Sequence, residues 1–353
     1  MPSSVSILTM IQSKFASSTA VVRLVIFMEN EYSSRMRVLV TGAQGCIGSW
    51  VVRQLLERGI DVLIYDLDAN PRRLAMIAGE GCANAVPVEI GAIQDTARLK
   101  TLVRDGGITH IIHLAAVLMP FCQVNPVEGG MINVIGTLNV FEAARDAGRP
   151  VRVAYASSAA VWGPDSAYED RPLTEADPLK PATHYGVFKA TNEESARVFY
   201  AANGISSVGL RPWTVYGVGR DSGLTADPTL AMNAVARRAP YQIRLSGPMD
   251  LQYVRDVAET FIRCVLSPIE GAYMFNLAGD IATIEEIIAL LGRIRPEAGQ
   301  LITSNGPRVP VAFKMDDSAL RRYVPDIPKT PLDEGVRETI DWFERLHAEG
   351  RLS

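Results

Sequence analysis

From Arg37 onward, short apolar runs rich in β-branched residues alternate with longer stretches of helical periodicity. The run at 111–116 is almost continuously apolar, as expected of a strand that helices cover on both faces. This alternation predicts an α/β fold with a Rossmann-type, doubly wound parallel sheet. Strands are predicted near residues 38–40, 62–65, 86, 110–114, 151–156 and 207–210, and helices near 47–58, 72–78, 132–147 and 185–202.

The pattern loosens after Arg211, where glycine and proline punctuate shorter elements. We therefore predict a Rossmann domain at 36–211 and a smaller C-terminal, substrate-binding lobe at 212–353. A helix at 254–266 and a strand at 273–277 are expected to return to the main sheet, so that the segment 251–278 interleaves the two parts.

The first 35 residues are treated separately, because the first 28 contain no acidic residue. Their composition loosely resembles a transit peptide. A disordered or misassigned extension is the favoured interpretation, because Met36 directly precedes the first predicted strand.

Composition narrows the class of partner. The chain has 353 residues, 48 % of them hydrophobic, and a net charge of −4, which gives no basic field for nucleic acid or an anionic membrane. The apolar run at 20–28 contains Arg23 and is too short to span a bilayer. The four cysteines and four histidines form no ligand cluster, so we expect no metal, a small-molecule partner and a reducing cytoplasm.

Three glycines lie between the first predicted strand and the first predicted helix, in the run TGAQGCIG at 41–48. Gly42 permits a tight turn, Gly45 lets the backbone approach a pyrophosphate, and Gly48 allows the helix to pack closely on the strand. The helix N-terminus adds free N–H groups and the positive end of the helix dipole. Because strand, turn and helix come in this order, we interpret the run as a dinucleotide site rather than a ligand-free glycine turn.

Asp66 ends the second predicted strand, about twenty residues after the glycines. A carboxylate there accepts hydrogen bonds from the adenosine ribose and repels a 2′-phosphate. Arg72 and Arg73 follow and are able to pair with such a phosphate, although a solvated first helical turn is the favoured interpretation. We predict NAD rather than NADP.

Tyr185 and Lys189 lie four residues apart at the start of a predicted helix, so their side chains share one face. A neighbouring ammonium favours the phenolate and lowers the tyrosine pKa toward working pH. The preceding strand ends in Ala156-Ser157-Ser158, which places a hydroxyl at the carboxyl end of the sheet. Such a pair is common on exposed helices, so its position after this strand is what makes it a candidate site near a nicotinamide.

Six ordered motifs resemble the extended short-chain dehydrogenase/reductases, also called the NAD-dependent epimerase/dehydratase family. The resemblance runs from about residue 36 to 343. It implies that Tyr185 is the general acid/base, that Lys189 lowers its pKa and holds the nicotinamide ribose, and that Ser158 hydrogen-bonds the reacting oxygen. The motifs are TGAQGCIG at 41–48, HLAA at 113–116, NVIGT at 133–137, SSAAVWG at 157–163, HYGVFK at 184–189 and LRPWTVYG at 210–217.

The same resemblance implies further cofactor contacts. Glu89 and Ile90 would border the adenine, although the family more often has Asp at the position of Glu89. His113 is expected to be packed rather than catalytic, and Asn133 to be a polar anchor in a helix. The predicted cofactor-binding residues are Gly42, Gln44, Gly45, Cys46, Ile47, Gly48, Asp66, Glu89, Ile90, Leu114, Ala115, Ala116, Asn133, Ala156, Tyr185, Lys189 and Pro212.

One departure from the family bears on the substrate. Members that act on nucleotide sugars commonly carry Arg-Asp, with the arginine on the diphosphate, where this chain has Met249 and Asp250. The missing phosphate partner favours a dehydrogenase of a small sugar, sugar acid or other secondary alcohol over a UDP-sugar 4-epimerase or a dehydratase. An NAD-binding regulatory protein is a third alternative, which the intact catalytic set disfavours.

The candidate substrate contacts are Ser158, Trp162, His184, Thr214, Arg220 and Arg244. Trp162 replaces a tyrosine common in the family, and is either core packing or a wall of the pocket. Arg220, Arg244 or Arg308 could replace the missing diphosphate arginine, but each is equally well explained as a surface charge. With a small substrate, Arg220 and Arg244 are candidates to hold a carboxylate. Family members often dimerise through two long helices, so we predict a homodimer through those at 132–147 and 185–202.

Overall fold

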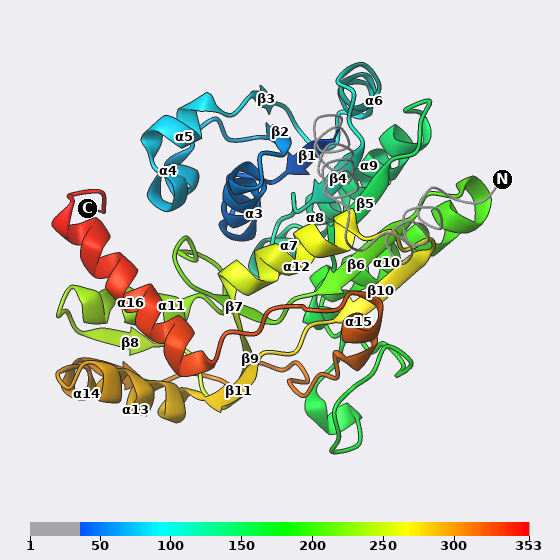
Figure 1. The fold of residues 1–353 in the computed structure, drawn as a ribbon. Coiled ribbons are helices and arrows are strands. Elements are labelled where there is room, and N and C mark those ends of the chain that lie inside the picture. The colour runs from blue at the N-terminus through cyan, green and yellow to red at the C-terminus, as the bar shows by residue number, and fades with distance from the viewer. Residues whose placement is uncertain (1–35, 353) are drawn as a thin grey trace, which may run out of the picture.

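The computed structural model describes residues 36–352 (Figure 1), and the expectations for residues 1–35 lie outside the described residues. Seven parallel strands form the main sheet in the order β10-β6-β5-β4-β1-β2-β3. The predicted doubly wound α/β fold is therefore confirmed. The strands are β1 Arg37–Thr41, β2 Asp61–Asp66, β3 Val88–Ile90, β4 His110–His113, β5 Arg152–Ala156, β6 Ser207–Arg211 and β10 Ala272–Asn276.

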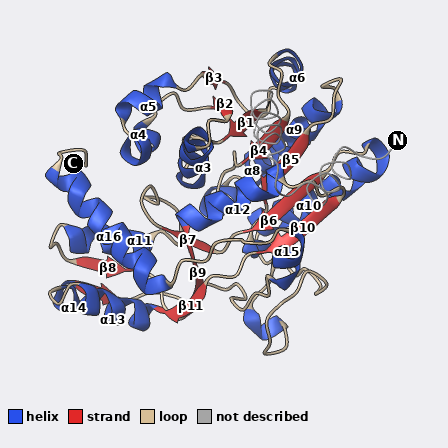
Figure 2. Cartoon of the chain, in the orientation of Figure 1, coloured by secondary structure: helices blue, strands red, loops and turns tan. Residues whose placement is uncertain are grey.

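Helices cover both faces of this sheet (Figure 2). Side chains of β1 alternate, so Val38 and Val40 enter one core cluster and Leu39 enters the other. This two-sided burial explains the continuous apolar run in the sequence. The first cluster includes α3 Cys46–Glu57, α4 Arg72–Ala78, α5 Glu80–Ala85 and α12 Val254–Leu266, and the second includes α6 Thr96–Asp105, α9 Gly136–Arg145 and α10 His184–Asn203.

Two predicted elements differ from the observed ones. The third strand begins at Val88 instead of near Val86, because α5 ends at Ala85 and Pro87 has no N–H to donate to β2. The helix predicted at 132–147 begins as a π-helical turn, Met131–Ile135, before α9. Short helices α7 Met119–Val124 and α8 Pro126–Gly130 precede it.

The C-terminal part of the chain is interleaved with the sheet. Strand β10 pairs with β6 at the edge of the main sheet, and α12 packs on β4 and β5. The remaining segments form a smaller lobe with its own three-stranded and two-stranded sheets. Its elements are β7 Thr214–Tyr216, α11 Asp227–Ala236, β8 Tyr241–Ile243, β9 Pro248–Tyr253, β11 Asp280–Thr283, α13 Ile284–Ile294, α14 Ala298–Leu301, β12 Ile302–Ser304 and α16 Leu332–Ala348. The remaining helix, α15 Ser318–Tyr323, packs on β10 at the edge of the main sheet.

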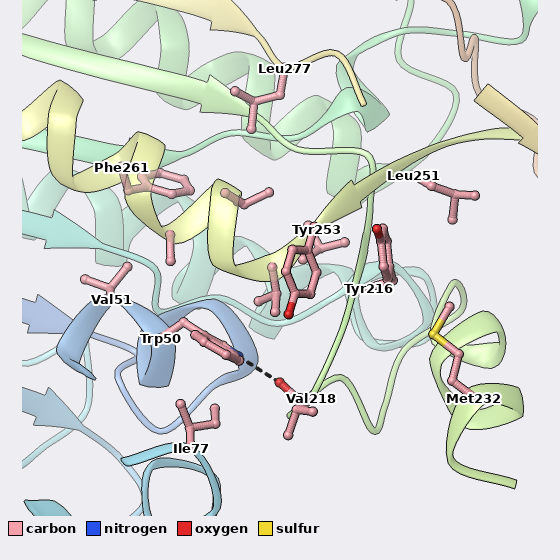
Figure 3. Close-up of a cluster of buried hydrophobic side chains, with 14 of the residues drawn as sticks. Trp50, Val51, Ile77, Tyr216, Val218, Met232, Leu251, Tyr253, Phe261 and Leu277 are labelled. Atoms are coloured by element: carbon pink, nitrogen blue, oxygen red, sulfur yellow. Dashed lines mark hydrogen bonds between the residues drawn. The ribbon is translucent and has the colours of Figure 1, made fainter. Parts of the chain in front are cut away.

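A continuous apolar core joins the lobe to the main sheet (Figure 3). Trp50 of α3 is buried in this core, and its indole Nε1 donates a hydrogen bond to the carbonyl of Val218, 2.9 Å away. The loop that follows β7 is thereby fastened against α3. Over residues 36–352, none of the helices is apolar and long enough to traverse a bilayer.

Candidate active site

A cleft of about 400 Å³ lies at the carboxyl edge of the main sheet, between the sheet and the smaller lobe. Four residues at or just after the ends of β1, β4, β5 and β6 line it: Gly42, Leu114, Ala156 and Pro212. The strand order reverses between β1 and β4, which is where ligands bind in open α/β sheets.

The glycines of the first loop form a close backbone cradle at one end of this cleft. Gly42 has φ +70°, and a Cβ there would lie 2.5 Å from the amide N of Ala115. A Cβ at Gly48 would lie 2.4 Å from the Gly42 carbonyl oxygen, so α3 packs directly on the turn. No described side chain caps the N-terminus of α3 at Gly45, which leaves its N–H groups available for an anion.

Arg73 adds positive charge to this end, and the charge of Arg220 acts on both Cys46 at this end and Tyr185. Arg73 and Arg220 both line the cleft, and Arg73 donates to the carbonyl of Gln44 at 2.9 Å. Burial raises the pKa of the nearby Cys46 thiol to about 12 although both arginines oppose the shift, so Cys46 stays protonated. A glycine cradle, an uncapped helix N-terminus and the Arg73 guanidinium suit the pyrophosphate of a dinucleotide, so the residues present fit NAD.

The predicted cofactor residues fall into two sets. Asp66 Oδ2 accepts the backbone N–H of Gln44 at 2.8 Å, which ties the end of β2 to the glycine loop. Glu89 pairs with Arg98 at 3.0 Å, while Ile90 is 39 % exposed at the end of β3. Eleven of the predicted residues line the cleft, and six, namely Gln44, Asp66, Glu89, Ile90, Ala115 and Asn133, lie outside its lining.

Tyr185, Lys189 and Ser158 converge in the same cleft. The Thr183 hydroxyl accepts the Gly186 N–H at 3.1 Å and so caps α10 just before the pair, which places Tyr185 and Lys189 one turn apart. Lys189 Nζ donates to the Ala156 carbonyl at 2.7 Å and lies 5.6 Å from the centroid of the Tyr185 ring.

Burial governs the protonation of this group. It raises the pKa of Tyr185 to about 12, although a hydrogen bond with Ser158 and the charge of Arg220 both lower it. The lowered tyrosine pKa expected from the sequence is therefore not found, because burial dominates. Burial lowers the pKa of Lys189 to about 8. At neutral pH the site therefore holds a protonated phenol beside an ammonium that loses its charge in mildly alkaline solution.

A buried ion pair between Arg211 and Glu193 packs against the site, and it was not predicted from the sequence. Glu193 lies one turn after Lys189 and accepts two hydrogen bonds from Arg211, at 3.0 and 2.7 Å. Glu193 also accepts the Ser157 hydroxyl, and the Arg211 guanidinium lies 4.6 Å from the centroid of the Trp162 ring. The spacing of Glu193 from Lys189 was the signal that could have found it.

His113 lies beneath the cleft as a packed residue. Its ring nitrogens contact the hydroxyls of Thr41 and Thr137 at 2.7 and 3.0 Å. Burial, reinforced by the charge of Lys189, lowers the pKa of His113 to about 3, so the ring is neutral. The nearby Asn133 is also buried, and its amide donates to the carbonyl of Val117 at 3.1 Å.

The opposite end of the cleft is mainly apolar. Trp162 lines it, and Arg220 borders it, with its Nη2 donating to the Thr225 hydroxyl at 3.2 Å. Nothing among residues 36–352 bonds to the buried Nε of Arg220. The apolar residues that line this end were not predicted from the sequence. Only Trp213 could have been found, because it follows the predicted Pro212. These lining residues are Leu118, Met119, Pro120, Trp213, Leu224, Val309, Pro310 and Val311.

Three predicted substrate residues lie outside the cleft lining. His184 is exposed and stacks on Phe188, because adjacent residues of a helix point in different directions. Thr214 is fully buried in β7. Arg244 binds the carboxylate of the buried Asp227 through its Nε and Nη2, which draws it away from the site.

Metal ligands were not expected from the sequence. Searched over the described part of the chain, no His, Cys, Asp and Glu side chains form a group able to hold a metal ion.

Met249, which stands where nucleotide-sugar enzymes commonly have arginine, is fully buried in the main core. Fold, glycine cradle and tyrosine–lysine pair together define an NAD-dependent oxidoreductase.

The chain belongs to the NAD dependent epimerase/dehydratase family, whose model matches residues 38–278. It is 29 % identical to a UDP-glucose 4-epimerase of Azospirillum brasilense over 90 % of this chain and 95 % of the relative. A UDP-glucose 4-epimerase of Thermus thermophilus in complex with NAD superposes with a TM-score of 0.73 at 27 % identity, over 87 % of this chain and 99 % of the other.

A third similarity concerns the fold alone. An L-threonine dehydrogenase from Phytophthora infestans superposes with a TM-score of 0.75 at 21 % identity, over 89 % of this chain and 99 % of the other. Epimerases and a dehydrogenase thus share this architecture, so the fold does not decide between the two activities.

Proposed function

We propose that this enzyme is an NAD-dependent dehydrogenase of a small secondary alcohol that carries an acid group, such as a sugar acid or another hydroxy acid. One observation carries the proposal: the half-buried Arg220 guanidinium lines the cleft beside its mainly apolar end, close enough to Tyr185 to lower its pKa. A carboxylate bound to Arg220 would hold the neighbouring carbinol near Tyr185.

The proposed roles follow from the positions of the side chains. When bound, NAD supplies the hydride acceptor. Tyr185 Oη takes the proton of the substrate hydroxyl, and Ser158 Oγ holds that oxygen in place. The Lys189 ammonium stabilises the phenolate that oxidation requires. Leu118 and Trp213 shield the reacting carbon from water.

The charges of the cleft support a small substrate. Three cationic side chains are found among its lining residues: Arg73, Lys189 and Arg220. Arg73 is ion-paired with Asp221, and Lys189 serves the Ala156 carbonyl beside Tyr185. This leaves Arg220 to bind an anion, whereas a nucleoside diphosphate presents two phosphates.

A substrate panel tests the proposal. Purified enzyme is incubated with NAD and with hydroxy acids, sugar acids, the matching neutral sugars and UDP-sugars, and absorbance of NADH is followed. We expect NADH with one or more acids and a weaker response with the neutral analogue of the same carbon skeleton. Equal turnover of the acid and its neutral analogue would contradict the role of Arg220.

A UDP-sugar 4-epimerase is the second candidate. The similarity to the Azospirillum brasilense UDP-glucose 4-epimerase over nearly the full length of both chains favours it. The buried Met249 in place of an arginine weighs against it. Conversion of a UDP-sugar to its epimer without net NADH, detected by chromatography, would establish this candidate instead.

We also propose a homodimer that forms through α9 and α10, in the cytoplasm. Val187 and Val198 on α10 are 46 % and 55 % exposed. They border an apolar depression that includes Leu138 and Phe199. The thiols of all four cysteines are unpaired, which suits a reducing compartment. Light scattering after size exclusion tests the dimer, and a monomeric mass would contradict it.

A further inference from the structure

Two arginines that follow β2 are both ion-paired with one aspartate from the smaller lobe. Asp221 Oδ1 accepts Arg73 Nη2 at 2.6 Å, and Asp221 Oδ2 accepts Arg73 Nε and Arg72 Nη2, each at 3.1 Å. Burial alone would raise the pKa of the Asp221 carboxyl, but hydrogen bonding and charge from Arg73 outweigh burial and lower it. Asp221 is therefore ionised at neutral pH.

The loop that carries Asp221 is built to reach across the cofactor end of the cleft. Gly217, Gly219 and Gly223 have φ values of +126°, +96° and +99°, which only glycine adopts without strain. Between them, the Val218 carbonyl is held by Trp50 of α3 (Figure 3). This turn thus holds Asp221 next to the start of α4.

The two arginines lie where dinucleotide-binding folds recognise the 2′-phosphate of NADP. In dinucleotide-binding folds, an arginine just after the second strand is what accommodates the 2′-phosphate of NADP. Arg73 is held from two sides, by Asp221 and by the Gln44 carbonyl of the glycine loop. The Arg72 side chain is 64 % exposed, and its guanidinium is directed toward the same carboxylate.

We propose that Asp221 is a specificity-determining residue for the cofactor. It neutralises Arg72 and Arg73 so that neither guanidinium is free for a 2′-phosphate, and it holds Arg73 beside the pyrophosphate end of the cradle. Asp66 then repels a 2′-phosphate without competition from a free cation. This inference concerns the cofactor alone and holds whichever substrate the enzyme uses.

Calorimetric titration of Asp221→Asn with NAD, NADP and adenosine 2′-phosphate tests the proposal without any substrate. We expect the ratio of the Kd for NADP to the Kd for NAD to fall by about tenfold, which is the worth of one charge-assisted hydrogen bond. Adenosine 2′-phosphate should bind more tightly by a similar factor. An unchanged ratio would overturn the proposal and leave Asp221 as a structural contact.

Two further variants keep the result interpretable. Asp341→Asn is the matched control, because it removes one carboxylate from an exposed ion pair with Arg295 and changes the net charge equally. Its NADP to NAD ratio should equal that of the unmodified enzyme. Adding Arg72→Ala to Asp221→Asn should reverse part of the gain, and a gain that persists in full would contradict a role for Arg72.

Circular dichroism melts show whether Asp221→Asn folds. If it does not, Asp221→Ser is titrated in its place, because serine is small and tolerated in a loop. The same fall in the ratio is expected, and its absence would again overturn the proposal.

Discussion

The two ends of the cleft are built in different ways. The cofactor end is made mainly of backbone, from the glycine loop at 42–48 and the residues that follow β4, and a Cβ at Gly42 or Gly48 would collide with this backbone at 2.5 Å or less. The substrate end is made of side chains from four separate segments: 118–120, 158–162, 212–225 and 309–311. The first end therefore tolerates little change, whereas the second is free to vary with the substrate.

Tyr185 stands where the two ends meet, and its loss should have the largest effect. Tyr185→Phe removes the group that exchanges the proton, so kcat should fall by about 10²–10⁴-fold while NAD still binds. Steady-state kinetics and calorimetry measure the two quantities. Tyr200→Phe, an exposed tyrosine on the same helix, should change neither. A variant at position 185 that keeps its rate would remove the tyrosine from the mechanism.

Arg220→Gln tests the substrate end. Loss of a charge-assisted contact to a carboxylate should raise KM for the acidic substrate by about 10- to 100-fold. The KM for its neutral analogue should hardly change. Arg244→Gln is the matched control, because Arg244 is bound to Asp227 outside the cleft lining, and it should leave both KM values unaltered. A large effect of Arg244→Gln would shift the anion site to that arginine.

Gly48→Ala tests the cofactor end. The new methyl group would meet the Gly42 carbonyl oxygen at 2.4 Å, so the free energy of unfolding should fall by about 1–3 kcal/mol. Affinity for NAD should fall with it, as the turn moves. Gly81→Ala in α5 is the control, because nothing lies within 4 Å of its Cβ position. Denaturant melts and calorimetry with NAD report the two effects, and a fully stable, NAD-binding Gly48→Ala would disprove the tight cradle.

The pH dependence of the oxidation rate should reflect the protonation of both Tyr185 and Lys189. Alcohol oxidation needs the Tyr185 phenolate, whose fraction rises with pH because the pKa of Tyr185 is about 12. Lys189 loses its charge above its pKa of about 8, which withdraws support from the phenolate. The oxidation rate should rise by at most about tenfold per pH unit and flatten above about pH 8. A flat profile from about pH 6 to pH 8 would contradict this coupling.

Much of the fold follows from local patterns in the sequence. Buried apolar runs and turn glycines located all seven strands of the main sheet, with β3 shifted by the proline at 87. Helix α13 was missed although a capping box, Thr283 with Glu286, announces it. The long helix α16 was also missed, and the π-helical turn at Met131–Ile135 has no simple periodic signal.

The residues of the site also divide into those that a local sequence pattern predicts and those that it does not. Gly42, Tyr185 and Lys189 belong to short local motifs, TGAQGCIG and HYGVFK, whose position after predicted strands was informative. The substrate end depends on tertiary contacts that no local spacing encodes. Arg220 and Arg244 were equivalent in the sequence, and the buried Asp227 distinguishes them by binding one of the two.

The stoichiometry of NADH to substrate is the most direct test of the proposed reaction. Enzyme, excess NAD and a limiting amount of the best acid from the panel are incubated to completion, and NADH, ketone and remaining substrate are quantified. We expect one NADH and one ketone for each alcohol molecule consumed. In Tyr185→Phe this reaction should be abolished. Consumption of substrate to an epimer without NADH would contradict it and assign the cleft to epimerisation.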